Sequence, residues 1–178
     1  MKANMEDSTL VYVIGYPGSG KTTAVNAAVN NLNPTLIMEP FKHTMYDNGL
    51  IQLGYWREAY GGTDALAYNI QPKVIAWLPT CAAPLVIGEG DRLANNAFFT
   101  AVQEQGRRLR IAHIKVGDLI ALKRIRQRGS QFNPAWIRRT MSKVDNLASK
   151  WRNYVVTIDG TRATDSICEE LKELLYVD

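Results

Sequence analysis

The order of apolar and polar positions along the chain predicts strands that alternate with helices. Short apolar runs typical of buried strands occur at 10–14, 35–38, 85–88, 111–116 and 154–158. Apolar residues at helical spacing predict helices over 21–31, 72–77, 93–104, 119–128 and 134–151, and from about 164 onward. This alternation is typical of an α/β fold in which helices cover both faces of a parallel sheet.

One glycine-rich motif lies directly after the first predicted strand and opens the first predicted helix. Its residues are Gly15, Tyr16, Pro17, Gly18, Ser19, Gly20, Lys21, Thr22 and Thr23. The pattern G-x-x-x-x-G-K-[ST] in this context predicts a loop whose backbone N–H groups surround the phosphates of ATP. Lys21 is expected to reach the outer phosphates and act in catalysis, and the Thr22 hydroxyl to bind Mg²⁺. The alternative is a glycine-rich turn whose lysine is merely solvated. That alternative does not explain why a strand, the motif and a helix follow one another in this order.

A second candidate for metal binding follows the strand at 85–88. Glu89 and Asp91 come where that strand emerges at the carboxyl edge of the sheet, the usual ligand side of such folds. Either carboxylate is suited to hold Mg²⁺, and we favour Glu89 because it is nearer the strand. Arg92 is suited to bind an acceptor phosphate, or to pair with a carboxylate at the start of a helix.

The densest positive cluster lies at 123–134, which we interpret as a lid. Arg124 and Arg128 share a helix face at i, i+4 spacing and are expected to close over the transferred phosphoryl group, whereas Arg126 points away. A solvated basic face is the alternative. Arg138 and Arg139 extend the patch and are also suited to contact a nucleic acid backbone.

Residues 40–64 are interpreted as an acceptor-site insertion, irregular from 41 to 62 with a hairpin turn at Asp47-Asn48-Gly49. Trp56 or Tyr55 is suited to stack on a base, and Arg57 to hold a phosphate. Asp64 is the candidate general base, which is needed if the acceptor is an alcohol. The alternative places Thr63 or Asp64 as the cap of a helix over 65–68.

Composition is that of an ordinary globular protein and predicts one domain over 1–178. The chain is 46% hydrophobic and 21% charged, with a formal net charge of +4, which suits nucleotides and nucleic acids alike. No apolar stretch approaches the ~20 residues that span a bilayer, and residues 1–8, expected to be flexible, lack a signal core. Cys81 and Cys168 are expected to be buried free thiols in the cytoplasm.

Taken together, the chain resembles the nucleotide-kinase branch of P-loop proteins, particularly thymidylate kinases. The resemblance rests on the motif at 15–23, the Asp91-Arg92 pair, the lid-like arginines and the loop Ile158-Asp159-Gly160-Thr161-Arg162. It implies a P-loop fold with about five parallel strands and ATP as donor. It also implies that Thr161 and Arg162 pack against the ATP base.

A closer resemblance is to small phage-encoded kinases with Gly-Thr-Asp followed by Gln-Pro, here Gly62-Thr63-Asp64 and Gln71-Pro72. Within that group are enzymes that phosphorylate the hydroxymethyl group of 5-hydroxymethyluracil in DNA during thymidine hypermodification. The stretch from Tyr55 to Asp64 departs from thymidylate kinases, which puts free dTMP in doubt as the substrate.

Three functions are therefore weighed. The first is an ATP- and Mg²⁺-dependent kinase acting on an alcohol of a modified pyrimidine in DNA, whose base must be extruded or single-stranded to reach the site. The second is a nucleoside monophosphate kinase acting on a free nucleotide. The third, a switch-type nucleotide-binding module, lacks support because the chain has no recognisable water-orienting or base-specificity motif. No membrane partner is expected, and no oligomeric state is predicted.

Overall fold

The computed structural model of the 178-residue chain describes residues 8–57, 61–129 and 133–176. The expectation of a flexible start, 1–8, falls outside this range except at Ser8. That residue is buried, and its carbonyl oxygen accepts a hydrogen bond from the Arg108 amide at 2.8 Å. Ser8 therefore lies in the packed part of the chain, directly before the first strand.

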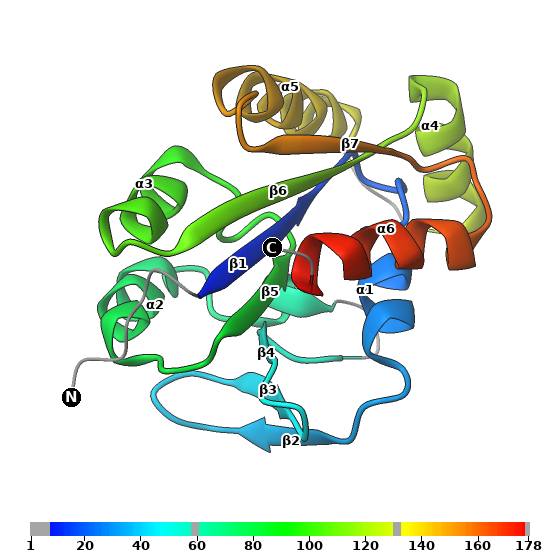
Figure 1. Cartoon of the computed structure of the whole chain (residues 1–178). Coiled ribbons are helices and arrows are strands. Elements are labelled where there is room, and N and C mark those ends of the chain that lie inside the picture. Colours follow the sequence, from blue (N-terminus) through cyan, green and yellow to red (C-terminus); the bar gives the residue numbers. More distant parts are fainter. Residues whose placement is uncertain (1–7, 58–60, 130–132, 177–178) are drawn as a thin grey trace.

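The described residues form one sheet of seven strands in the order β2-β3-β4-β5-β1-β6-β7 (Figure 1). The strands are β1 (Thr9–Ile14), β2 (Pro34–Ile37), β3 (His43–Tyr46), β4 (Ile51–Leu53), β5 (Leu85–Glu89), β6 (Arg108–Lys115) and β7 (Val155–Asp159). The neighbours from β4 through β5, β1 and β6 to β7 pair in parallel, whereas β2 and β3 add an antiparallel edge. The expected α/β fold with about five parallel strands is confirmed.

The strands that make up the parallel set differ from those expected in one place. The run at 35–38 belongs to the antiparallel edge, and its position in the parallel set is taken by β4 from the segment expected to be irregular. Turn formation at Asp47-Asn48-Gly49 is confirmed, with the Gly49 amide donating to the Tyr46 carbonyl at 2.9 Å. The pattern did not reveal β3 (HTMY) and β4 (IQL), because both are short and mix polar with apolar residues, so neither forms an apolar run.

Helices lie on both sides of the sheet and agree with the expected segments to within a few residues. The α-helices are α1 (Lys21–Val29), α2 (Gln71–Trp77), α3 (Asn96–Glu104), α4 (Asp118–Gln127), α5 (Pro134–Lys150) and α6 (Thr164–Tyr176), and the 3₁₀ turns are η2 (Gly62–Ala65) and η3 (Leu78–Thr80). Helix α3 begins later than expected because the Asn95 side chain caps it, accepting from the Phe98 amide at 3.1 Å. No helix in the described residues is long and apolar enough to cross a membrane.

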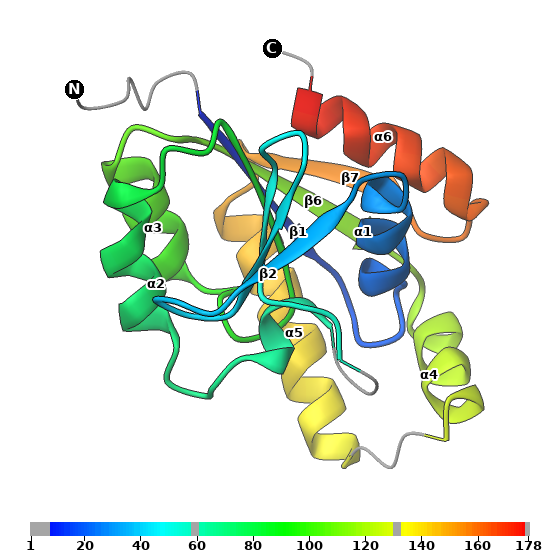
Figure 2. The same ribbon diagram turned by 90° about the horizontal axis from the view of Figure 1, so that it is seen from below.

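Alternate side chains of the central strand β1 enter two separate cores. Leu10, Tyr12 and Ile14 pack with residues of α2, α3 and α5 on one face. Val11 and Val13 pack with residues of α1 and α6 on the other face. The two groups of helices lie on opposite sides of the sheet (Figures 1 and 2). Cys81 and Cys168 are buried and free, as expected. The two layers leave the carboxyl ends of β4, β5 and β1 together at one edge, where the glycine motif begins.

Candidate active site

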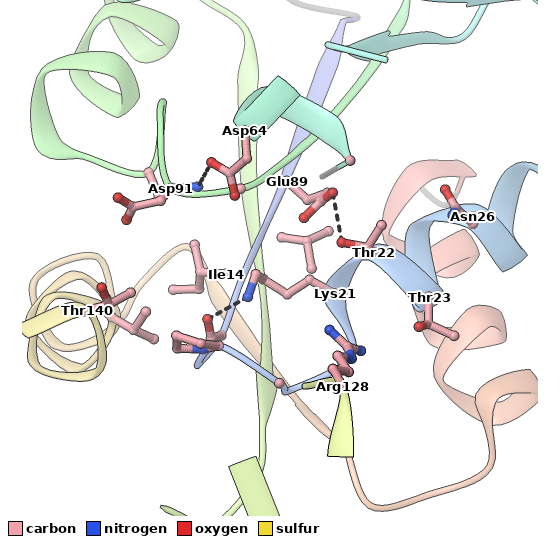
Figure 3. A pocket seen from close by; sticks show the side chains of 18 of the residues that line it. Ile14, Lys21, Thr22, Thr23, Asn26, Asp64, Glu89, Asp91, Arg128 and Thr140 are labelled. Atoms are coloured by element: carbon pink, nitrogen blue, oxygen red, sulfur yellow. Dashed lines mark hydrogen bonds between the residues drawn. The ribbon is translucent and has the colours of Figure 1, made fainter. Parts of the chain in front are cut away.

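The glycine motif forms a loop between β1 and α1, and Lys21 folds back over it. Lys21 Nζ donates to the carbonyl oxygens of Gly15 at 2.9 Å and Tyr16 at 3.1 Å (Figure 3). Gly18 has a φ of +81°, and a Cβ there would lie 2.7 Å from the Ala121 carbonyl oxygen, so α4 approaches the loop too closely for a side chain. The loop is therefore a compact cradle at the N-terminus of α1, where backbone N–H groups favour an anion.

The first residue pair expected to bind metal is brought together by the structure. The Thr22 hydroxyl donates to Glu89 Oε1 at 3.1 Å, and the Glu89 side chain is 2% exposed (Figure 3). The other candidate carboxylate, Asp91, forms an ion pair with Lys143 of α5 at 2.7 Å. The geometry therefore favours Glu89 over Asp91 as the partner of Thr22.

Asp64 lies in the 3₁₀ turn η2, next to the loop after β5 that carries Asp91. Its Oδ1 accepts hydrogen bonds from the backbone amides of Asp91 at 2.7 Å and Arg92 at 3.3 Å (Figure 3). The expected alternative, a cap for a helix over 65–68, is wrong because the next α-helix begins at Gln71. The two amides hold the carboxylate in place and leave its second oxygen without a partner among the described residues.

A hydrogen-bond network anchors η2 to the centre of the sheet. The Tyr12 hydroxyl donates to the Gly90 carbonyl at 2.9 Å and lies 3.1 Å from Thr63 Oγ1, which donates to the Glu89 carbonyl at 2.9 Å. Tyr12 and Thr63 are both fully buried. Because this network joins the turn carrying Asp64 to the strand carrying Glu89, the spacing between the two carboxylates is set by buried backbone.

Two glycines allow this close contact between turn and strand. Gly62 has a φ of +59°, and a Cβ there would lie 2.5 Å from Glu89 Oε1 and 2.6 Å from the Glu89 carbonyl oxygen. A Cβ on Gly54 would collide with the Gly62 carbonyl. Gly54 and Gly62 therefore lie in contact, so the segment 55–61 begins and ends at the same place on the sheet.

Gly62→Ala is expected to destabilise the protein by several kcal/mol, because a left-handed φ costs a side-chain residue ~1–2 kcal/mol and the collision with Glu89 adds to it. The matched control is Gly49→Ala, at a φ of +84° with no atom within 4 Å of the added Cβ. Urea unfolding should show the larger loss for Gly62→Ala, with the control losing about 1 kcal/mol. Equal losses in the free energy of unfolding would show that η2 shifts to accommodate the added methyl group.

These residues border a cavity of about 520 Å³. It is bounded by the glycine loop, the start of α1, η2, the end of β5 and one side of α5. Lining residues include Gly15, Pro17, Gly18, Lys21, Thr22, Thr23, Asn26, Trp56, Arg57, Asp64, Glu89, Asp91, Arg128, Trp136, Thr140 and Val144. The sites expected for ATP phosphates, metal and acceptor therefore share one cavity.

The expected lid arginines have different positions. Arg128 lines the cavity (Figure 3). Arg124 instead packs on the glycine loop, donating to the carbonyl oxygens of Ser19 at 3.4 Å and Gly160 at 3.2 Å. The expectation that both close over one phosphoryl group is therefore corrected for Arg124, which ties α4 to two loops. Residues 130–132 of the expected lid, 123–134, lie outside the described residues.

A smaller cavity of about 170 Å³ lies between the glycine loop, α4 and the β7–α6 loop. Its lining includes Ser19, Gly20, Arg124, Arg128 and Arg162. The Arg162 side chain also pairs with Glu170 of α6. Thr161 is not among the lining residues: its hydroxyl donates to Asp159 Oδ1 at 2.7 Å. Of the two residues expected near the ATP base, the structure places Arg162 at a cavity and Thr161 in a turn.

The residues expected to bind the acceptor separate into two groups. Trp56 and Arg57 line the main cavity, and the Trp56 side chain is 62% exposed. Arg92 is not among the lining residues; its Nε donates to the Leu66 carbonyl at 3.4 Å and its guanidinium lies 4.8 Å from the Tyr68 ring centroid. Arg92 therefore supports the segment after η2, and no described carboxylate forms an ion pair with it. Residues 58–60 of the expected acceptor segment lie outside the described residues.

Helix α5 contributes site residues that the sequence did not single out. Trp136, Thr140 and Val144 line the cavity at intervals of four, so they share one helix face. The helix also contacts the glycine loop and the loop after β5. Asp145 accepts a hydrogen bond from the Tyr16 hydroxyl at 2.8 Å, and Lys143 binds Asp91. The i, i+4, i+8 spacing was visible in the sequence, but it fits ordinary core packing equally well.

Burial shifts the titration of the three charged groups at the centre of the site. It raises the pKa of the Glu89 carboxyl above its ordinary value, and Lys21 opposes this shift. Burial also raises the pKa of Asp64, against the effects of the Asp91 amide and Lys21. The pKa of Lys21 is lowered by burial, and the three carboxylates nearby oppose that shift. The cation and the carboxylates therefore depend on one another to stay charged.

The donor set fits a Mg²⁺–nucleoside triphosphate. Thr22 and Glu89 offer a hydroxyl and a carboxylate, both oxygen ligands of the kind Mg²⁺ prefers, and Lys21 offers a cation for phosphate. Mg²⁺ usually takes one or two protein ligands and completes its shell with phosphate oxygens and water. Within the described residues no group of three or more His, Cys, Asp or Glu side chains is placed to hold a metal by itself.

Comparison with known proteins gives a family model and several structural neighbours. A family model described as P-loop Nucleotide Kinase3 matches residues 6–163. A gluconokinase from Sinorhizobium meliloti 1021 superposes with a TM-score of 0.55 at 14% identity, covering 96% of this chain and 93% of that one. A sugar kinase from Janibacter sp. HTCC2649 gives 0.54 at 14% identity, covering 92% of each chain.

A third neighbour is deoxyadenosine kinase from M. mycoides with bound dCTP, with a TM-score of 0.52 at 9% identity, covering 93% of this chain and 97% of that one. At these identities the likeness concerns the fold. No curated protein matches the chain by sequence.

Proposed function

This chain belongs to the P-loop nucleotide kinase family, and on that premise we propose that it phosphorylates an alcohol on a modified pyrimidine in DNA. The chain is an ATP-dependent kinase by family and fold. The acceptor we propose is the hydroxymethyl group of 5-hydroxymethyluracil in phage DNA, a step toward thymidine hypermodification. This finer assignment starts from the motif Gly62-Thr63-Asp64.

The observation that carries the proposal is the Asp64 carboxylate inside the cavity. An alcohol must lose its proton as it attacks phosphorus, and a positioned carboxylate can take that proton. A phosphate acceptor needs no base, and it would be repelled by two carboxylates at the same wall, the buried Glu89 and the half-buried Asp64. The raised pKa of Asp64 moves the group toward the range in which a base accepts a proton efficiently.

In the proposed reaction, Lys21 and the loop amides hold the outer phosphates of ATP. Thr22 and Glu89 hold Mg²⁺, which neutralises phosphate charge when bound. The acceptor oxygen forms a bond to the γ-phosphorus, the bond to the ADP oxygen breaks, and Asp64 takes the hydroxyl proton. Arg128 stabilises charge on the transferred group. The products are ADP and a phosphate monoester on the acceptor.

A second candidate is a kinase of free nucleoside monophosphates, favoured by the position of Arg57. Arg57 lines the cavity, and a guanidinium there can make a bidentate contact to an acceptor phosphate. In that reaction Asp64 has no proton to remove and would only orient neighbouring backbone.

A side-by-side acceptor assay tests these candidates. Labelled ATP and Mg²⁺ are supplied with hydroxymethyluracil DNA, unmodified DNA, dTMP or hydroxymethyl-dUMP. We expect label in the hydroxymethyluracil DNA and none in unmodified DNA, because only the former carries the alcohol. Label found solely in dTMP would reject the alcohol acceptor and select the second candidate. A reaction with chelated Mg²⁺ provides the background.

A further inference from the structure

A polar groove of about 460 Å³ lies outside the cavity, between α5 and the start of α3. Three cationic side chains line it, Arg139, Lys143 and Lys150, together with Asn95, Asn96 and Asn146. The Asn95 amide is already used within the protein, since it donates to Gln71 Oε1 at 2.6 Å and caps α3. No carboxylate is among the described residues that line this groove. Arg139 and Lys150 are exposed and make no ion pair within the described part of the chain. The groove therefore offers positive charge and hydrogen-bond donors, and its chemistry fits an anion.

The cationic residues form a line along one helix face rather than a point. Positions 139, 143, 146 and 150 follow i, i+4, i+7 and i+11 spacing, so their side chains share one side of α5. Arg139 and Lys150 are about 16 Å apart along the axis at ~1.5 Å per residue. That length is several times the ~3.4 Å rise per nucleotide in a strand. A single phosphate group would use only part of this line.

The amide of Asn96 is oriented by a neighbouring side chain. The indole N–H of Trp151, which can only donate, bonds to Asn96 Oδ1 at 2.9 Å. The side-chain oxygen of Asn96 is thereby occupied, and its N–H groups are left as the donors at the groove. Asn96 thus adds a neutral donor beside the cations, which suits a phosphate oxygen.

The groove adjoins the acceptor side of the cavity through one ion pair. Lys143 lines the groove and binds Asp91 Oδ1 at 2.7 Å, and Asp91 lines the cavity. Helix α5 borders both spaces, with Thr140 and Val144 toward the cavity and Arg139 toward the groove. The cavity and the groove therefore share α5 as a common wall, with the Asp91–Lys143 ion pair between them.

We propose that this groove binds the phosphodiester backbone of a single DNA strand that flanks the acceptor nucleotide. The inference rests on the proposed function, and it places the part of the DNA strand outside the cavity in this groove. A charged track for the backbone next to aromatic side chains is the usual design of single-strand binding sites, and Trp56 and Trp136 lie at the cavity. A free nucleotide in the cavity would leave the groove without a role.

Binding of a fluorescent thymidine oligonucleotide of about twelve nucleotides tests the groove without any phosphoryl transfer. The variant is Arg139→Ala/Lys150→Ala, which leaves Lys143 and its bond to Asp91 intact. Fluorescence anisotropy at about 50 to 200 mM salt gives affinity and its salt dependence. We expect at least tenfold weaker binding, and a salt slope smaller by about 1.4, which is ~0.7 for each lost phosphate contact.

The control is Lys172→Ala on α6, which removes one positive charge, against two in the double variant, from the opposite face of the sheet. It should bind the oligonucleotide as the unaltered protein does, and all variants should bind ATP equally. The proposal is overturned if the unaltered protein does not bind the oligonucleotide, if the double variant binds it normally, or if the control weakens binding equally.

Phosphorylation assays separate failure of the groove from failure of the proposed function. If the protein phosphorylates hydroxymethyluracil DNA and the double variant does so with unchanged KM, the groove is wrong and the function stands. If the oligonucleotide binds through the groove but no DNA is phosphorylated, the groove stands and the function is wrong. A raised KM for DNA with unchanged kcat in the double variant supports both.

Discussion

Asp64→Asn is expected to lower kcat for phosphorylation of the alcohol acceptor by about 10²–10⁴-fold while leaving ATP affinity nearly unchanged. Asparagine keeps an oxygen that can accept from the Asp91 and Arg92 amides, so the turn η2 should hold its shape. The substitution removes only the ability to take a proton. Steady-state kinetics and calorimetric titration with an ATP analogue measure the two quantities. Full activity in this variant would remove Asp64 from the mechanism.

The pH dependence of the unaltered protein provides an independent check on Asp64. A general base works only when deprotonated, so kcat/KM should fall as the pH drops through the pKa of Asp64. Burial raises that pKa above the ordinary 3.8, so the fall should begin at a higher pH than an exposed aspartate would give. The residual activity of Asp64→Asn should lack this fall. An acid limb unchanged by the substitution would belong to another group.

Glu89→Gln is expected to have two opposite effects, loss of activity and gain of stability. Loss of a metal-binding carboxylate removes several kcal/mol of transition-state stabilisation, or at least about 100-fold in rate. Burial raises the folded-state pKa of Glu89, so its charged form costs stability at any pH above that value. Gln removes the charge and can still accept from the Thr22 hydroxyl. The melting temperature without nucleotide should rise by about 2–4 °C per kcal/mol recovered.

The stability gain expected for Glu89→Gln depends on pH. Below the raised folded-state pKa of Glu89 this cost begins to decline, and it is gone once the pH is below the ordinary 4.5, so the two melting temperatures should converge over this range. Asp91→Asn is the matched control, because Asp91 is paired with Lys143 and its side chain is 45% exposed. It should leave the Mg²⁺ dependence of activity unchanged. If Asp91→Asn abolished Mg²⁺ dependence instead, the two carboxylates would exchange roles.

The sequence predicted those parts of the fold in which residue type and local geometry are strongly linked. The glycine motif, the strand before it and the helix after it form one rigid unit, so Lys21 and Thr22 lie where the pattern placed them. The buried strand ending at Glu89 was recognisable from its apolar run. The parallel order β4-β5-β1-β6-β7 then brings Glu89 to Thr22, since neighbouring parallel strands end at the same edge.

The remaining site features depend on contacts between distant segments. Arg124 and Arg128 share a helix face in the sequence, yet only the packing of α4 against the loop shows that Arg124 is occupied by carbonyl oxygens. Asp64 is held by amides 27 and 28 residues away. The bond between Lys143 and Asp91 spans 52 residues. The spacing of residues along the sequence does not encode such long-range contacts. It therefore could not separate residues that face the cavity from residues that support the loops.

The contact between Gly54 and Gly62 has a consequence for engineering new acceptor specificity. Residues 55–61, which include Trp56 and Arg57, begin and end at one point that the buried sheet holds together. Lengthening a loop with fixed ends costs only about 0.6 kcal/mol for each doubling. Gly61 must stay glycine, because a Cβ there would lie 2.7 Å from Thr22 Cγ2. Libraries of altered length and sequence can therefore be grafted between Gly54 and Gly61, while Asp64 and Glu89 keep their spacing. Selection for new acceptors should begin there.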